Sequence, residues 1–118
     1  MKPIIYCYER CGTCKKALKW LEENKVDFIS RSITEETPSV DDLKQLYERS
    51  ELKLRRFFNT SGMKYRELKL SKRLPEMSES EQLELLASDG MLIKRPLLIT
   101  DDAVLTGFKP DIWEEILL

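Results

Sequence analysis

Apolar residues in the N-terminal part of the chain change spacing twice, and each change marks a new element. Residues 3–8 are rich in β-branched and aromatic side chains and predict a short strand. From residue 11 to about residue 24 the spacing is helical, whereas residues 26–33 alternate as a second strand does. The connections are only about two residues long, so these elements predict a βαβ unit with parallel strands and a right-handed crossover.

Helical patterns dominate the middle of the chain. Ser39 is placed to cap a helix that runs to about Ser50, and Ser78-x-x-Glu81 is a capping box for a later helix that Gly90 ends. Between them, residues 52–58 and 65–70 predict further helical turns around a turn cluster at residues 59–62. We therefore expect several short helices in succession.

The C-terminal part returns to β character and ends in a helix. Residues 97–100 and 103–108 predict two short strands joined by a turn at Asp101 and Asp102, and Pro110 is suited to open the last helix. The predicted fold class is α/β: a mixed four-stranded sheet flanked by helices, in the order βαβ, helical insertion, ββα. We expect residues 1–118 to form one domain with the helical insertion at about residues 34–90.

The composition limits the classes of protein to which the chain can belong. A hydrophobic content of 42% and a charged content of 35% are those of an ordinary globular domain. The net charge of −1 gives no overall electrostatic reason for direct DNA binding, and no apolar run is long enough to span a membrane. The N-terminal residues lack the apolar core of a signal peptide, so we expect a cytoplasmic protein.

The chemistry-bearing feature is Cys11-Gly12-Thr13-Cys14, at the junction of the first predicted strand and helix. A sulfur at a helix start meets unpaired N–H groups and the positive end of the helix dipole, which favour the nucleophilic thiolate. We interpret Cys11 as the nucleophile and Cys14, on the core side of the helix, as the resolving thiol. The chain has no histidine, so we expect neither a Cys–His zinc site nor a histidine triad. A structural zinc site would need the three thiols and a carboxylate as ligands, and we expect no metal.

The cysteines also allow interpretations without redox chemistry. Cys11 and Cys14 could be packing residues without redox chemistry. Cys7, in the first predicted strand, is interpreted as a buried packing thiol that points away from the helix mouth.

A Cys-x-x-Cys in a βαβ unit followed by ββα is typical of the thioredoxin-like fold. In that fold a cis proline precedes the third strand and lies beside the active cysteine. Pro96 stands at this position, immediately before the strand at residue 97. Arg95 is then expected to project close to Cys11, where its charge would favour a thiolate or bind an anion. The alternative is an ordinary proline at a strand entry beside a surface arginine.

Three segments carry a resemblance to a known family: Cys11-Gly12-Thr13-Cys14, the run from Phe57 to Leu68, and Leu92-Ile93-Lys94-Arg95-Pro96. Over essentially its whole length the chain resembles the arsenate reductase-like family, which includes ArsC arsenate reductases, Spx-type redox regulators and many uncharacterised members. The resemblance implies the thioredoxin-like fold, no bound cofactor, and glutathione as a co-substrate with glutaredoxin or thioredoxin as partner.

The resemblance also implies a set of site residues. Cys11 corresponds to the cysteine that attacks arsenate in ArsC enzymes, and Arg95 corresponds to one of three arginines that hold the oxyanion. The other two arginine positions carry Asn59 and Lys109, which lack the planar fork of a guanidinium. We expect Cys11, Cys14 and Arg95 to be catalytic, and the substrate or partner to contact Gly12, Thr13, Asn59, Pro96 and Lys109.

Three functions follow from these residues. The first is a cytoplasmic thiol–disulfide oxidoreductase. The second is an arsenate reductase that depends on glutathione and glutaredoxin. The third is an Spx-type redox regulator that binds the α subunit of RNA polymerase, although the region around residues 50–54 lacks the glycine that Spx regulators use for this contact.

Overall fold

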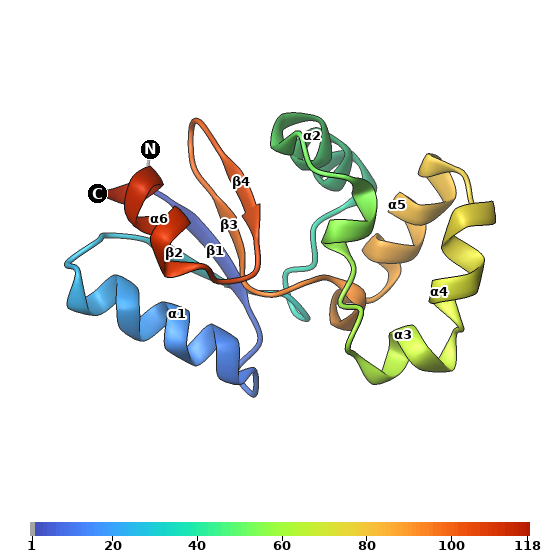
Figure 1. Ribbon diagram of the computed structural model, residues 1–118, viewed down its shortest axis with the longest axis horizontal. Coiled ribbons are helices and arrows are strands. Elements are labelled where there is room, and N and C mark those ends of the chain that lie inside the picture. The colour runs from blue at the N-terminus through green and yellow to red at the C-terminus, as the bar shows by residue number, and fades with distance from the viewer. Residues whose placement is uncertain (1) are drawn as a thin grey trace. The chain divides into compact units, whose positions relative to one another are not determined.

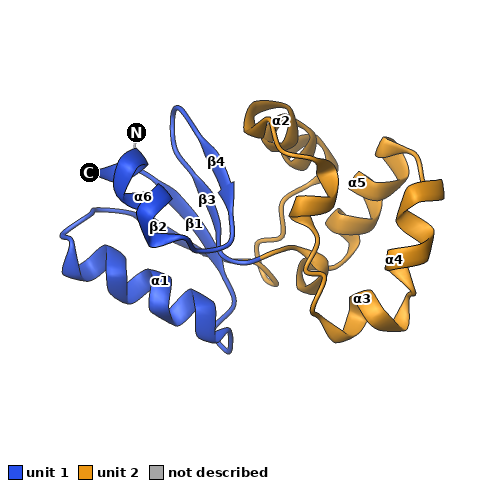
Figure 2. Cartoon of the chain, viewed as in Figure 1, with its two compact units in different colours: residues 1–32, 95–118 blue, residues 33–94 orange. Residues whose placement is uncertain are grey.

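The computed structural model describes residues 2–118, which form two compact units (Figures 1 and 2). Unit 1 comprises the chain up to Ser32 together with residues 95–118, and unit 2 comprises residues 33–94. Unit 2 is therefore one continuous segment between the two parts of unit 1. The single-domain organisation expected from the sequence stays a prediction.

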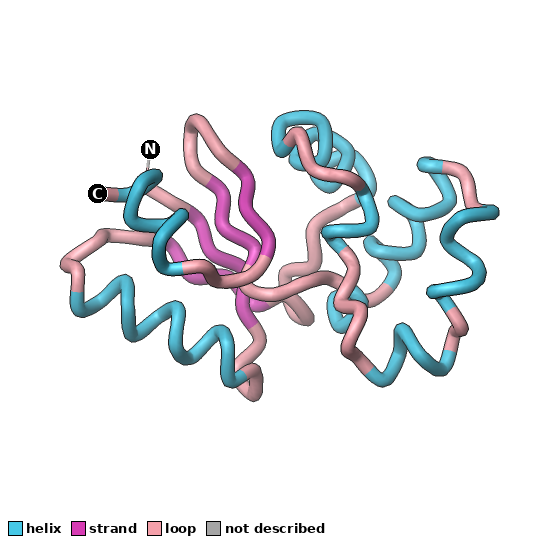
Figure 3. The backbone as a smooth tube through the Cα atoms, in the orientation of Figure 1, coloured by secondary structure: helices cyan, strands magenta, loops and turns pink. Residues whose placement is uncertain are grey.

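The strands of the described residues all belong to unit 1 (Figure 3). They are β1 (Ile4–Cys7), β2 (Ile29–Ser32), β3 (Leu97–Ile99) and β4 (Val104–Thr106), in the spatial order β2-β1-β3-β4. Strand β1 is parallel to β2 and antiparallel to β3, and β3 is antiparallel to β4. This sheet confirms the predicted mixed, four-stranded, thioredoxin-like fold.

Helices α1 (Gly12–Glu23) and α6 (Pro110–Leu117) pack on the same face of the sheet. Ile5 lies opposite Leu98 in the register of β1 and β3, so both side chains point to this face. They form one core cluster with Ala17 and Leu21 of α1 and with Trp113 of α6, which is only 1% exposed. Cys7 lies two residues after Ile5 and faces the same way, so its thiol lies in this core together with that of Cys14.

Unit 2 is helical. Its elements are α2 (Val40–Ser50), η1 (Leu54–Phe57), α3 (Met63–Glu67), α4 (Leu70–Arg73), η2 (Leu74–Glu76), α5 (Glu79–Ser88) and η3 (Gly90–Leu92), where η denotes a 3-10 helix. No helix formed by residues 2–118 has the length and apolar composition needed to cross a bilayer.

The predicted N-caps at Ser39 and Ser78 are confirmed atom by atom. Ser39 accepts a hydrogen bond from the backbone N–H of Asp42 at 3.1 Å. Ser78 and Glu81 form the reciprocal capping box, with N–H donors at 3.1 and 3.0 Å. These side chains satisfy N–H groups that have no partner within their own helix, which explains why the helices begin where they do.

The second strand begins three residues later than expected, at Ile29 instead of residue 26. After α1 the chain adopts a left-handed conformation at Lys25, with φ of 55°, and the Val26 N–H donates back to the Leu21 carbonyl at 3.0 Å. That bond closes the C-terminal turn of α1 and occupies the N–H that a strand would need.

Candidate active site

Cys11 occupies the N-cap position of α1, with φ of −89° and ψ of 116°. Its sulfur accepts a hydrogen bond from the Cys14 backbone N–H at 3.4 Å, and its own N–H donates to the Tyr8 carbonyl at 3.0 Å. A cap normally offers an oxygen to the free N–H groups of the first turn, and here a sulfur takes that place. The half-buried thiol of Cys11 is therefore held at the positive end of the helix and remains accessible.

Cys14 lies on the inner side of the same helical turn. It is only 1% exposed and packs in the unit 1 core with Ala17 and Leu21. An external disulfide can therefore reach Cys11 but not Cys14. This asymmetry is the one that a Cys-x-x-Cys needs if one thiol attacks and the other resolves.

Cys7 is a third thiol of the site, and the expectation that it points away from the helix mouth is wrong. It is buried, 7% exposed, as expected, but its side chain hydrogen-bonds to that of Cys14. Strand alternation explains the contact, since Cys7 shares the parity of Ile5 and so faces α1. The alternation visible in the sequence indicates the face of β1 on which Cys7 lies, but not which side chain of α1 it meets. All three cysteines are free thiols, and the described residues contain no group of three or more ligands that could hold a metal ion.

The pKa values of the two buried thiols, Cys7 and Cys14, shift in opposite directions. The Cys7 side chain, acting as donor, lowers the pKa of Cys14 to about 6, helped by the Tyr8 backbone and the Cys11 side chain, while burial opposes the shift. The same hydrogen bond, together with burial, raises the pKa of Cys7. Arg95 lowers the pKa of both groups through its charge. These shifts favour the thiolate form of Cys14 and the protonated form of Cys7.

We expect thiolate absorbance to report this pair directly. In the reduced protein one thiolate should form with a midpoint near pH 6, protonated below it and charged above it. Cys7→Ala removes the first donor and should raise that midpoint by about one to two pH units, whereas Cys7→Ser keeps a donor and should leave it nearer the wild-type value. Cys14→Ser should abolish the transition and Cys11→Ser should retain it. An unchanged midpoint in Cys7→Ala would contradict the hydrogen bond.

Arg95 and Pro96 lie at the entry to β3. The Arg95–Pro96 peptide bond is cis, as expected, and Pro96 is buried. The Arg95 guanidinium lies over the Tyr8 ring, 5.4 Å from its centroid, in a cation–π contact. Because Tyr8 precedes the Cys-x-x-Cys by three residues, this contact holds a fixed positive charge close to the thiol cluster.

The remaining predicted residues divide between the two units. Gly12 and Thr13 are exposed in the first turn of α1, next to Cys11. Lys109 is exposed at the N-cap of α6, also in unit 1. Asn59 belongs to unit 2, where it forms a turn: its N–H donates to the Leu92 carbonyl at 2.8 Å and its carbonyl accepts from Gly62 at 3.1 Å. Unit 1 therefore holds every predicted site residue except Asn59.

The family model for the ArsC family matches residues 6–116 of this chain. The uncharacterized protein YusI of Bacillus subtilis is 58% identical over 115 residues, covering 98% of both chains. The Global transcriptional regulator Spx 2 of Bacillus anthracis is 25% identical over 92% of this chain and 81% of its own.

Two solved structures share the whole fold. An ArsC family related protein from Bacteroides fragilis has a TM-score of 0.94 at 49% identity, with 98% of each chain covered. An arsenate reductase from Vibrio cholerae has a TM-score of 0.87 at 27% identity, covering 99% of this chain and 98% of its own.

Proposed function

Because the chain belongs to the ArsC family, we propose that it is a cytoplasmic thiol–disulfide oxidoreductase in which Cys11 attacks and Cys14 resolves. The observation that carries the proposal is the pair of thiols on one helical turn, one accessible at the helix start and one 1% exposed beneath it. The lowered pKa of Cys14, to about 6, supports it because the resolving thiol is then ready as a thiolate.

The reaction consists of two exchanges. The Cys11 thiolate attacks one sulfur of a substrate disulfide, so a mixed disulfide forms and the other substrate sulfur leaves as a thiolate. The Cys14 thiolate then attacks the Cys11 sulfur, which forms the Cys11–Cys14 disulfide and releases the second substrate thiolate. The substrate disulfide gains two electrons and the protein dithiol loses two. An external thiol, glutathione or the dithiol of glutaredoxin or thioredoxin, restores the reduced protein.

The neighbouring residues have roles that do not require a bound cofactor. Arg95 supplies positive charge that favours thiolates in the cluster. We expect the partner chain to contact Gly12 and Thr13 at the exposed start of α1, and Pro96 at the entry to β3. Lys109 and Asn59 are assigned to substrate binding by the family resemblance alone.

The proposal is tested by oxidising the protein with a small disulfide such as oxidised glutathione. We expect the protein to lose two hydrogens, peptide mapping to identify a Cys11–Cys14 link, and a reducing dithiol to reverse it. A link that includes Cys7 in place of Cys11, or no intramolecular disulfide at all, would show that the assigned pair is wrong.

Arsenate reduction is the second candidate, favoured by the arsenate reductase from Vibrio cholerae among the structural relatives and by Arg95. In that reaction Cys11 would attack arsenate, and glutathione with glutaredoxin would complete the reduction. Cys14 competes with glutathione for the Cys11 intermediate, and Asn59 and Lys109 replace two oxyanion-binding arginines. The absence of arsenate-dependent NADPH oxidation, in an assay coupled through glutaredoxin and glutathione reductase, would exclude this candidate.

A redox-switched regulator is the third candidate, favoured by the similarity to Spx 2. Its predicted partner is the α subunit of RNA polymerase. Pull-down with the purified subunit, using oxidised and reduced protein in parallel, separates this function from the two enzymes, and no binding in either state would rule it out.

A further inference from the structure

The Tyr65 hydroxyl of unit 2 is a buried polar group that the fold itself does not use. Tyr65, on α3, is 5% exposed, and within residues 2–118 its hydroxyl oxygen is buried without a hydrogen-bond partner. Leaving such a group unpaired costs about 1–3 kcal/mol. The ring itself is well placed, packed edge-to-face on Phe58 with centroids 6.4 Å apart. The packing thus holds the hydroxyl in a position where no group of residues 2–118 pairs with it.

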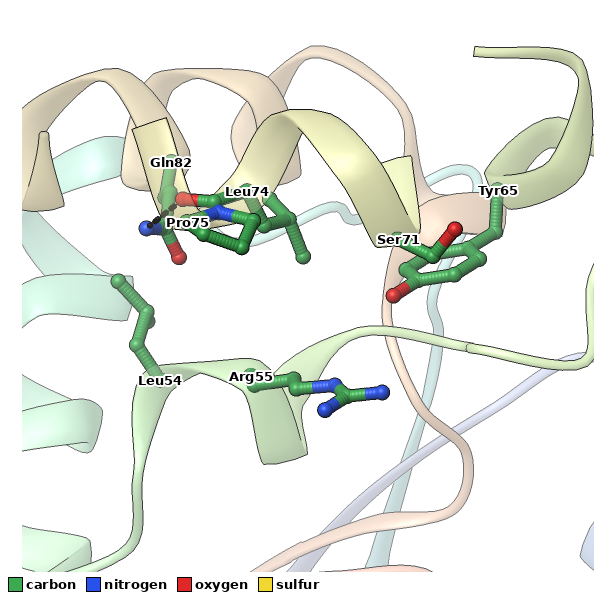
Figure 4. Close-up of a pocket in the computed structure, with 7 residues that line it drawn as sticks. All are labelled: Leu54, Arg55, Tyr65, Ser71, Leu74, Pro75 and Gln82. Atoms are coloured by element: carbon green, nitrogen blue, oxygen red, sulfur yellow. Dashed lines mark hydrogen bonds between the residues drawn. The ribbon is translucent and has the colours of Figure 1, made fainter. Parts of the chain in front are cut away.

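This hydroxyl points into a pocket that we call the apolar pocket (Figure 4). The pocket has a volume of about 270 Å³, and its apolar wall is formed by Leu54, Leu74 and Pro75. Arg55 borders it from the side opposite Ser71, and its guanidinium extends towards the space below the Tyr65 hydroxyl (Figure 4). The Gln82 amide does not compete for this space, since it donates to the Leu74 and Met77 carbonyls at 3.2 Å each.

A second pocket, here called the basic pocket, shares Tyr65 and Ser71 with the first. It has a volume of about 350 Å³, and its remaining lining residues are Thr60, Arg66, Lys69 and Lys72. Neither pocket has a carboxylate in its lining. The Tyr65 ring therefore contributes both to an apolar pocket bordered by one arginine and to a second pocket lined by three cations.

The sequence around the pockets is strongly basic in a chain that is nearly neutral. Residues 53–73 contain eight Lys and Arg residues and one acidic residue, Glu67, so the segment carries +7. The whole chain has 20 basic and 21 acidic residues, which leaves 12 basic and 20 acidic residues elsewhere. A local charge of this size attracts small anions to the segment.

We propose that the two pockets beside Tyr65 form a binding site for a small phosphorylated compound with an apolar or aromatic body. The body lies against Leu54, Leu74 and Pro75, and the phosphate accepts hydrogen bonds from the Tyr65 hydroxyl and from the cations around it. A phosphate suits this set better than a carboxylate because it carries more charge and more acceptor oxygens. The site is separate from the thiol cluster and does not depend on the redox function proposed above.

The size and burial of the site favour a small molecule over a nucleic acid. A cavity of about 270 Å³ is slightly smaller than the usual range for ligand pockets, which suits only a small molecule. The unpaired hydroxyl is buried, whereas binding to a nucleic-acid backbone uses exposed cations. The decisive residue is therefore Tyr65 and not the total charge.

The probe is phenyl phosphate, titrated into isotopically labelled full-length protein and followed by NMR chemical shifts. We expect saturable shifts that centre on the backbone amides of Tyr65, Ser71 and Arg55, with inorganic phosphate and benzoate each binding at least about fivefold more weakly because each lacks half of the ligand. Tyr65→Phe should weaken phenyl phosphate about tenfold, the loss of one hydrogen bond to a charged group. It should not lower the melting temperature, because no internal hydrogen bond is lost.

Lys44→Gln is the matched control, since Lys44 is an exposed cation on α2 that lines neither pocket. Lys69→Gln should weaken binding clearly more than this control. The proposal is overturned if phenyl phosphate shows no saturable binding, if Tyr65→Phe binds as tightly as wild type, or if Lys44→Gln weakens binding as much as Lys69→Gln. Binding of a short oligonucleotide that is insensitive to Tyr65→Phe, with no response to phenyl phosphate, would also overturn it.

Discussion

Cys11→Ser should abolish disulfide reductase activity, with a loss of at least about a thousandfold, because a serine hydroxyl is not ionised at neutral pH and cannot attack a disulfide. The measurement is turnover of a small disulfide in an assay coupled to glutathione reductase or thioredoxin reductase. The substitution changes one atom at the N-cap, and serine is itself a favoured cap. Folding should therefore be unaffected, and full activity in this variant would refute the mechanism.

Cys14→Ser is the matched partner of that experiment and should behave differently. Cys11 remains able to attack, so the variant should accumulate a stable mixed disulfide with the substrate thiol, visible as added mass on Cys11. Turnover should fall unless an external thiol replaces the resolving group. If Cys14→Ser and Cys11→Ser gave the same unmodified protein, Cys14 would not be a resolving thiol that acts after Cys11.

The second large effect is expected from Gly90→Ala, which should destabilise the protein by about 3 kcal/mol and lower its melting temperature by about 10 °C. A β-carbon at Gly90 would collide with the Ile33 carbonyl and would also approach the Thr37 hydroxyl at 3.1 Å. That hydroxyl already donates a hydrogen bond to the Ile33 carbonyl at 2.6 Å. This bond fixes the carbonyl that the added β-carbon would meet. Thermal unfolding followed by circular dichroism measures the change.

Gly12→Ala is the control for this substitution. An added β-carbon at Gly12 meets nothing within 4 Å, and the residue lies in the first turn of α1. Its melting temperature should be unchanged or slightly higher, because alanine favours the helix. Equal destabilisation of both variants would mean that the close approach at Ile33 is not what selects glycine at position 90.

Gly90 also illustrates how a correct position can be predicted for an incorrect reason. The sequence pattern places it as the stop of the preceding helix, but α5 ends at Ser88 and is followed by Asp89 in an extended conformation. Asp89 accepts the Met91 N–H at 2.9 Å and thereby starts η3. Glycine is required at position 90 because another segment of the chain approaches it, and a local pattern contains no information about such an approach.

The fold itself was largely predictable because its determinants are local. Alternation in β1, helical spacing in α1, the caps at Ser39 and Ser78, and the turn at Asp101 and Asp102 depend on neighbours within a few residues. The Cys-x-x-Cys at a strand–helix junction likewise places Cys11 at the helix start and Cys14 beneath it, since helix geometry alone separates the two thiols.

By itself, then, the sequence determined the order of strands and helices, the position of the two-thiol motif and the family. Only the tertiary structure decided that Cys7 joins Cys14 and lowers its pKa, because that contact depends on how β1 packs against α1. Only the tertiary structure, too, revealed the unpaired Tyr65 hydroxyl beside two pockets lined by cations. Both features arise where separate elements pack together. Their chemical consequences depend on burial, which no single segment of the sequence specifies.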